Sequence, residues 1–228
     1  DLSISRTLEG ISTFHEIKDK TLEAYGYDIL GLTYLHKGDF ASCYDTCLKA
    51  EKLGKEANAI FAIADSYTRR AFMEIHQNKL KEAKDILEKI EKISEKKTFH
   101  AVYANYFKAM AYLTIKANDI EQAKLFGQKM LEGQLSQRNF LSLIPALEIG
   151  AIIACKNERF ESSAILLFGS QKFRTELTTP IQAYEKQDFL NLEKQLEESL
   201  SADVLASIKS KYLPLEELTN ISEEIFLS

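Results

Sequence analysis

The chain has 228 residues, 45% of them hydrophobic and 28% charged, which is long enough for a sizeable core and ordinary for a globular protein. Its net charge of −5 argues against direct nucleic-acid binding, because a phosphate backbone selects basic surfaces. No apolar run reaches the roughly 18 residues of a membrane span, no stretch has the pattern of a signal peptide, and three cysteines make no disulfide framework, so we expect a cytoplasmic protein without membrane contacts.

Residues 1–20 are expected to form the second helix of a truncated repeat. Ser3, Thr7 and Gly10 fall in step with the small residues of the repeats that follow. A folded array would not naturally expose the face that a missing first helix covers. We therefore expect further repeats, or another domain, before residue 1.

Residues 21–175 repeat four times at a period of 40 residues, without insertion. Scarce glycine (9) and proline (3) favour helices joined by short loops over a many-stranded β fold. Each repeat is predicted to hold two amphipathic helices, at 21–36 and 40–54 in the first. Small residues would let the helix backbones approach closely, beside bulky ones. The bulky column reads Phe40, Leu80, Ile120 and Phe160, and a small-residue column reads Gly31, Ala71, Ala111 and Ala151.

The first repeat also carries a recognisable motif. In LGLTYLHKGDFASCYDTCLKA (30–50), Gly31, Tyr34, Gly38-Asp39-Phe40, Cys43 and Ala50 stand where the tetratricopeptide (TPR) motif has its Gly, Tyr, Gly-Asp-Tyr/Phe and two Ala. The chain thus resembles a TPR array, with a period longer than the usual length of about 34. In this longer period the chain resembles the TPR-like arrays of large bacterial transcription activators and signalling ATPases.

Cys43 and Cys47 are four residues apart and close to His36, a spacing that places both sulfurs on one helix face. A metal site needs three or four ligands, and no fourth is evident. Cys43 shares its column with Ala83, Ala123 and Ser163. The pattern therefore favours core packing, with a redox pair as the alternative.

Residues 176–228 are predicted to form a C-terminal helical cap on the last repeat. A helix is expected over 184–200, a second one capped by Ser201, and a third starting near Pro214. LLFG (166–169), Tyr184-Glu185 and LPLEEL (213–218) resemble the tails of bacterial LuxR-type regulators and related signalling ATPases. Those tails usually have a Trp and a Gly shortly before the segment that corresponds to LPLEEL, and both are absent here. The resemblance implies a sensor or scaffold array whose ATPase or DNA-binding domain lies outside this chain.

The predicted fold is thus all-α: a right-handed α-solenoid of TPR-like hairpins with a helical cap. In TPR arrays the first helix of each hairpin lines a concave groove, and the resemblance places thirteen residues there. Asn105 would hold backbone amides, and Lys108 or Lys116 a carboxylate. Alternatively, the cations that end each first helix merely cap its dipole. The groove residues are Tyr25, Asp28, His36, Asp65, Thr68, Phe72, His76, Asn105, Lys108, Tyr112, Lys116, Glu148 and Lys156.

No P-loop, GxSxG, HExxH or GxGxxG motif occurs, so no catalytic residue, metal or cofactor is predicted. The leading hypothesis is a non-enzymatic module of a bacterial regulatory protein that binds a protein segment, a peptide or a small effector. The alternative is a scaffold that self-associates, for example as a homodimer. An α-helical enzyme is the third possibility and would need a titratable cluster in a deep pocket.

Overall fold

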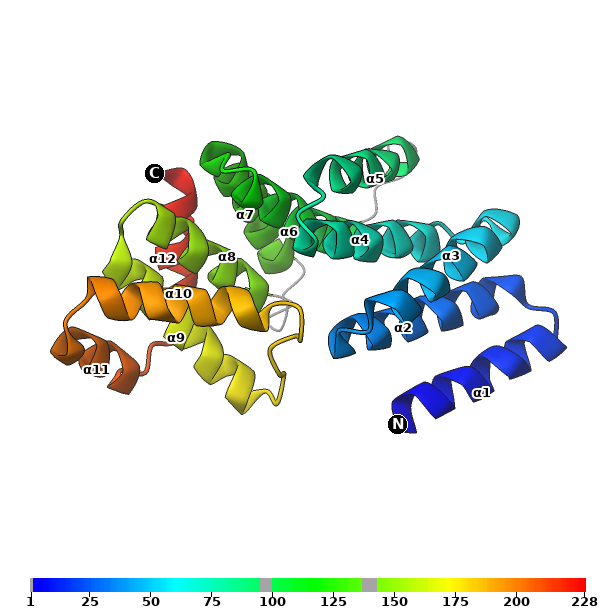
Figure 1. The fold of residues 1–228 in the computed structure, drawn as a ribbon, viewed down its shortest axis with the longest axis horizontal. Coiled ribbons are helices and arrows are strands. Elements are labelled where there is room, and N and C mark those ends of the chain that lie inside the picture. Colours follow the sequence, from blue (N-terminus) through cyan, green and yellow to red (C-terminus); the bar gives the residue numbers. More distant parts are fainter. Residues whose placement is uncertain (1, 95–99, 137–142) are drawn as a thin grey trace. The chain divides into compact units, whose positions relative to one another are not determined.

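A computed structural model of the chain describes residues 2–94, 100–136 and 143–228. Within these ranges every regular element is an α-helix (Figure 1), which confirms the all-α prediction. No helix in the described ranges is both long and apolar enough to cross a membrane. The chain divides into two compact units, which are described separately. Unit 1 comprises Asp1–Ala109 and Gln182–Tyr184, and unit 2 comprises Met110–Ile181 and Glu185–Ser228.

Unit 1 is a stack of helical hairpins in chain order (Figure 1). Helix α2 packs on α1 and α3, and α4 packs on α2, α3 and α5. The helices of the first repeat include both predicted segments, 21–36 and 40–54, and extend each by one to three residues at an end. The bounds are α1 Leu2–Glu16, α2 Lys20–Lys37, α3 Phe40–Ala57, α4 Ile60–His76 and α5 Leu80–Ser94, followed by α6 His100–Lys116, which ends in unit 2.

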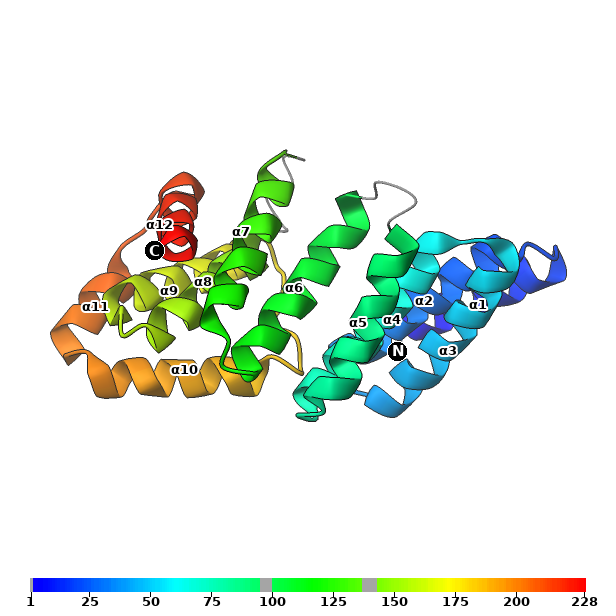
Figure 2. The ribbon, with the colours of Figure 1, turned by 90° about the horizontal axis from the view of Figure 1, so that it is seen from above.

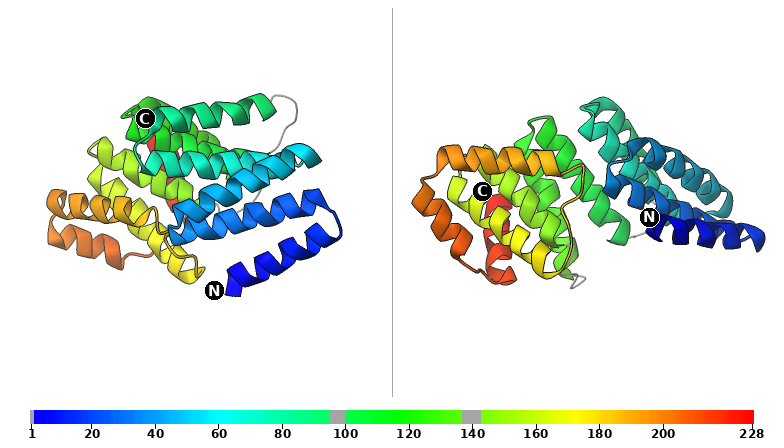
Figure 3. Two further views of the ribbon diagram at one scale, coloured as in Figure 1. Left: turned by 45° about the vertical axis from the view of Figure 1, so that its right-hand side comes forward. Right: turned by 60° about the horizontal axis from the view of Figure 1, so that its bottom comes forward.

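Unit 2 contains further consecutive helices that pack on one another, and the C-terminal helices of the chain pack against them. Helix α8 packs on α7 and α9, and α12 lies against α7, α8 and α9 (Figure 2). Helices α10 and α11 both pack on α9 (Figure 3). The bounds are α7 Ile120–Ser136, α8 Leu143–Lys156, α9 Phe160–Glu176, α10 Lys186–Ser199, α11 Ala202–Ser210 and α12 Leu215–Leu227.

The backbone of the turns follows the 40-residue period. Gly38, Asn78, Asn118 and Glu158 all have left-handed backbones, with φ of 76°, 60°, 59° and 59°. Each follows the first helix of a hairpin, at the position where helices commonly end in this conformation. Glycine and asparagine adopt it at low cost, whereas a glutamate does not. The period therefore extends to backbone geometry, even where the residue type changes.

After two of these four turns an aspartate caps the next helix. The Asp39 carboxylate accepts a hydrogen bond from the backbone N–H of Ser42 at 3.1 Å, and this bond lowers the pKa of Asp39. Asp119 accepts one from the N–H of Gln122 in the same way, also at 3.1 Å. Each carboxylate satisfies a donor that the first helical turn leaves without a partner.

Small residues lie where the helices approach most closely. Ala71, Ala111 and Ala151 are fully buried, and a Cβ on Gly31 would lie 3.2 Å from the Cys47 sulfur. Cys43 and Cys47 are themselves fully buried, with their sulfurs 4.0 Å apart. They pack in a core cluster with Leu35 and Met73, the environment that their column predicts.

The cap begins its helices where the sequence indicates. The Ser201 hydroxyl accepts a hydrogen bond from the backbone N–H of Val204 and caps α11, and Pro214 is the N-cap of α12. The predicted 184–200 helix is observed as α10, Lys186–Ser199. The predicted cap at Ser201 and the predicted helix start near Pro214 are therefore confirmed.

Glycines make room for α12 on the helices that it covers. A Cβ on Gly127 would lie 2.5 Å from the Phe226 ring, one on Gly150 2.8 Å from the Ser222 hydroxyl, and one on Gly169 2.6 Å from a Leu218 methyl. The three partners are four residues apart and so share one face of α12. That face can approach α7, α8 and α9 only because each presents a residue without a side chain.

Candidate functional site

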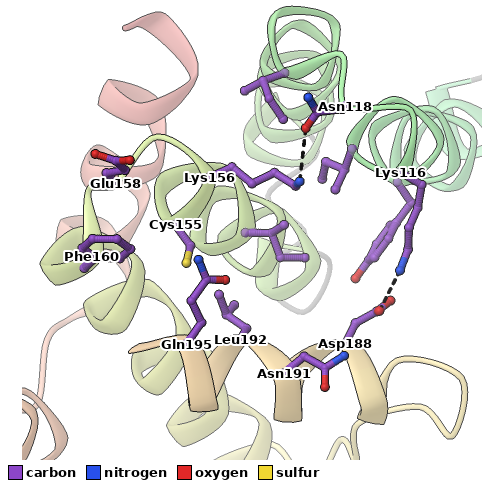
Figure 4. A pocket seen from close by; sticks show the side chains of 14 residues that line it. Lys116, Asn118, Cys155, Lys156, Glu158, Phe160, Asp188, Asn191, Leu192 and Gln195 are labelled. Atoms are coloured by element: carbon purple, nitrogen blue, oxygen red, sulfur yellow. Dashed lines mark hydrogen bonds and ion pairs between the residues drawn. The ribbon is translucent and has the colours of Figure 1, made fainter. Parts of the chain in front are cut away.

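Unit 2 contains a pocket of about 650 Å³, a volume typical of small-molecule sites. It lies where the C-terminal ends of α6 and α8 face α10 (Figure 4). The repeat register supplies one wall, because its residues come as pairs 40 apart. These pairs are Tyr112 and Ile152, Ile115 and Cys155, Lys116 and Lys156, Asn118 and Glu158, and Ile120 and Phe160.

Two lysines end their helices at the pocket and have different partners (Figure 4). The Lys116 Nζ lies 2.7 Å from a carboxylate oxygen of Asp188, on α10. The Lys156 Nζ lies 3.5 Å from the amide oxygen of Asn118, in the α6–α7 turn. Both lysines therefore reach across to another segment, which is more than the dipole-cap alternative requires. Lys116 is neutralised by its partner, whereas Lys156 meets a neutral oxygen.

The floor of the pocket is apolar. Tyr112, Ile115, Cys155 and Leu192 line it and are buried. Burial raises the pKa of the Cys155 thiol, outweighing a lowering by its hydrogen bond with Ser163. The thiol is therefore protonated at neutral pH and contributes apolar surface instead of a nucleophile.

Helix α10 adds two amide side chains to the rim. The Asn191 amide oxygen accepts a hydrogen bond from Gln187 at 3.0 Å, one turn earlier on α10. Gln195 is exposed and projects from α10 toward Cys155 (Figure 4). Its amide can both donate and accept a hydrogen bond. The pocket thus combines an apolar floor with a few convergent polar groups, the usual constitution of a ligand site.

In unit 1 the surface of the same register is covered by the chain itself. The backbone N–H of Ala183 donates to the carbonyl of His36 at 3.4 Å. The Tyr184 ring packs on Phe72 and His76, with centroid distances of 5.9 and 5.0 Å. Residues 182–184 thus cover, in unit 1, the repeat positions whose counterparts in later repeats form the pocket wall in unit 2.

Lys108 is part of this covered surface. It is 9% exposed, and its Nζ lies 5.5 Å from the Phe72 ring centroid and 5.8 Å from that of Tyr184. Two aromatic faces stabilise the buried cation. The structure therefore places Lys108 in the packing of unit 1, unlike the open groove position expected from the sequence.

Other predicted groove residues of unit 1 are committed to internal contacts. Asp28 forms a buried ion pair with Arg69, with Nη2 to Oδ2 at 3.2 Å, and burial lowers the pKa of Arg69 to about 10. The Thr68 hydroxyl donates to the Ala64 carbonyl at 3.0 Å and is buried. Tyr25 packs against a core cluster around Ala24. These side chains do not line an open groove.

Asp65 and Asn105 lie together in unit 1. The Asn105 amide nitrogen is 3.5 Å from an Asp65 carboxylate oxygen. Burial raises the pKa of Asp65 to about 6, although the bond from Asn105 opposes the rise. The Asn105 amide therefore contacts Asp65 within the chain, and the expected contact of Asn105 with a ligand backbone stays a prediction.

The last predicted groove residue, Glu148, is buried in unit 2. Its carboxylate accepts two hydrogen bonds from Arg174, from Nε at 2.6 Å and from Nη2 at 2.8 Å. Burial alone would lower the pKa of Arg174, but the bonds and charge of Glu148 raise it overall. Of the thirteen predicted residues, the unit 2 pocket thus gathers Tyr112, Lys116 and Lys156.

Sequence reasoning missed the α10 wall of the pocket. Asp188, Asn191, Leu192 and Gln195 lie outside the repeats, so no column identified them. Their spacing of three and four residues was a signal for one helix face, but not for what that face covers. Among the described residues, no group of three or more His, Cys, Asp or Glu side chains could hold a metal ion.

No protein-family model matches the chain, and no curated protein has a significantly similar sequence.

Proposed function

We propose that the chain is a non-enzymatic, effector-binding helical-repeat module of a larger bacterial regulatory protein in the cytoplasm. The pocket of unit 2 carries this proposal, because it joins an apolar floor to Lys116, Lys156 and the α10 amides in a volume of about 650 Å³. The regulatory context comes from the resemblance to TPR-like arrays. A binding event at the pocket would be passed on to a neighbouring domain.

Two features of the pocket support binding over catalysis. The thiol of Cys155 is held protonated by burial, as its raised pKa indicates. The Asp188 carboxylate is paired with Lys116 at 2.7 Å, so its negative charge is compensated. Neither group is activated in the way that a nucleophile or general base requires.

The test is ligand retention. The purified chain is incubated with cell extract, dialysed and measured by native mass spectrometry. We expect a bound small molecule or short peptide in the wild type. Gln195→Trp places a ring over the pocket and should abolish retention, whereas Leu190→Trp changes an exposed residue of the same helix outside the pocket and should retain the ligand. Equal retention by both variants, or turnover of the bound molecule, would contradict the proposal.

Self-association is a second candidate, and one observation favours it. Leu2, Leu8 and Ile17, in and just after α1, are 74%, 46% and 62% exposed, and Ile29 of α2 is 54% exposed. Apolar side chains that gather in one exposed patch often mark protein contacts, and these four come from or adjoin two helices that pack on each other. Sedimentation velocity over a hundredfold concentration range tests the idea. A dimer that grows with concentration and is lost in Leu8→Glu would support it, and a monomer throughout would exclude it.

A further inference from the structure

We propose that the unit 2 pocket binds a small monocarboxylate with an apolar body, and that Lys156 anchors the carboxylate. This inference rests on the proposed function and names its ligand class.

The first argument is charge. Asp188 compensates Lys116 at 2.7 Å. Lys156 has only the Asn118 amide oxygen at 3.5 Å, and no carboxylate of the described chain lies within ion-pair distance of it. A carboxylate at Lys156 would gain a charge-assisted hydrogen bond without breaking an ion pair. The positive charge of Lys156 is thus available to a ligand.

The number of charges favours a monoanion. Two lysines and two acids, Asp188 and Glu158, line the pocket, so its formal charge is zero. One added negative charge can pair with Lys156 and brings the formal charge of the pocket only to −1. A phosphate monoester carries about −1.5 to −2 at neutral pH and would leave excess negative charge beside the two acids. A single carboxylate fits this balance better.

The rest of the ligand is defined by the floor and by Gln195. Leu192, Ile115 and Cys155 are buried at the floor and offer contacts to hydrocarbon. No hydrogen bond joins the Gln195 amide to another described residue, and the amide projects toward Cys155 (Figure 4). It can therefore bond a carboxylate oxygen or a polar substituent of the ligand. An apolar body next to one acid group satisfies both features.

The burial of other groove columns favours a small molecule over an extended peptide. A peptide along the predicted groove would need Asp28, Thr68, Lys108 and Glu148 at its surface, but all four are buried. The pocket is local, and its volume of about 650 Å³ is in the range that holds a drug-sized molecule. The ligand is therefore expected to fit within the pocket.

Isothermal titration calorimetry with matched probes tests the proposal. Octanoate and 3-phenylpropionate are compared with their primary amides, which have the same shape without the charge. We expect the acids to bind at least about tenfold more tightly than the amides, a difference of about 1.4 kcal/mol. Lys156→Met keeps the stem but removes the charge, and should weaken the acids by about tenfold while changing the amides by less than about twofold. Lys194→Met, on α10 but outside the pocket, should change neither.

Three results would overturn the inference: equal binding of acids and amides, unchanged binding of acids to Lys156→Met, or no binding of either acid. Its failure can be distinguished from that of the proposed function. A neutral extract molecule that is retained by the wild type and lost in Gln195→Trp would contradict the monocarboxylate ligand class. It would still support the proposed effector-binding function. A chain that retains nothing from any extract and binds no probe would remove both.

Discussion

Arg174 donates two hydrogen bonds to the Glu148 carboxylate, from Nε to Oε1 at 2.6 Å and from Nη2 to Oε2 at 2.8 Å, and both residues are buried. The Glu185 carboxylate lies 3.9 Å from the same guanidinium and is also buried. One arginine is thus the cation that both carboxylates face inside unit 2, and its removal should be costly.

Arg174→Met should lower the free energy of unfolding by about 3–5 kcal/mol, because it leaves buried carboxylates without their cation. Urea unfolding at neutral pH measures this. The control is Lys194→Met, which breaks an exposed pair with Glu198 at 3.8 Å and should cost no more than about 0.5 kcal/mol. Similar losses in the two variants would show that the buried pair contributes little.

Two glycines of α7 should respond oppositely to alanine. A Cβ at Gly127 would lie 2.5 Å from the Phe226 ring, whereas nothing lies within 4 Å of one at Gly133. Gly133→Ala should stabilise the helix by up to about 1 kcal/mol. Gly127→Ala should be destabilising overall, because overpacking costs about 1–3 kcal/mol. Thermal unfolding of both variants decides, and stabilisation by both would mean that Phe226 moves away freely.

The pH dependence of stability should contain a contribution from Asp65. Its pKa is about 6 in the folded chain against an ordinary 3.8, so between these values the folded state binds more protons than the unfolded state. Asp65 therefore lowers the unfolding free energy as pH rises from about 4 to 6, by up to about 1.4 kcal/mol per pH unit. Above pH 6 the loss is complete.

Asp65→Asn removes this titration. Urea unfolding of both proteins at several pH values should show the variant gaining stability over the wild type as pH rises from about 4 to 6, with a constant advantage above. A difference that does not change with pH across this window would contradict the raised pKa. Asp39→Asn is the opposite control. Because the pKa of Asp39 is lowered in the folded chain, this variant should lose stability relative to the wild type as pH rises toward the ordinary pKa of an aspartate.

Thr178 should be replaceable with a gain in stability. Its φ is 52° just beyond α9, a left-handed conformation that is unfavourable for a β-branched residue. Thr178→Gly should raise the unfolding free energy by about 1 kcal/mol, the strain released less the entropy that glycine loses. Thr175→Gly, inside α9, should instead lower it by about 0.3 kcal/mol, the difference in helix propensity between the two residues. A loss in Thr178→Gly would show that the threonine side chain makes a compensating contact.

The 40-residue register predicted much of the fold because a repeat constrains the same physical property several times. Gly38 and Asn118 both have left-handed backbones, and Ala71 and Ala151 are both buried at helix crossings. The same register also supplies one wall of the pocket, including the predicted Lys116 and Lys156. Independent copies of one pattern make such predictions robust.

What the register could not predict comes from segments outside it. The second pocket wall belongs to α10, and Tyr184 covers Lys108 in unit 1. The partners of Asp28 and Glu148 are Arg69 and Arg174, which have no counterparts in the other repeats. A column gives the face of a helix, but the contacts that bury this face depend on residues far away in sequence.

The glycine-lined contact of α12 has a consequence for handling the protein. Phe226, Ser222 and Leu218 cover Gly127, Gly150 and Gly169 on three helices at once. A version shortened before Leu215 would expose a continuous apolar surface on α7, α8 and α9, and such surfaces promote aggregation. The last helix therefore shields this face of unit 2, and expression tags are safer at the other end of the chain.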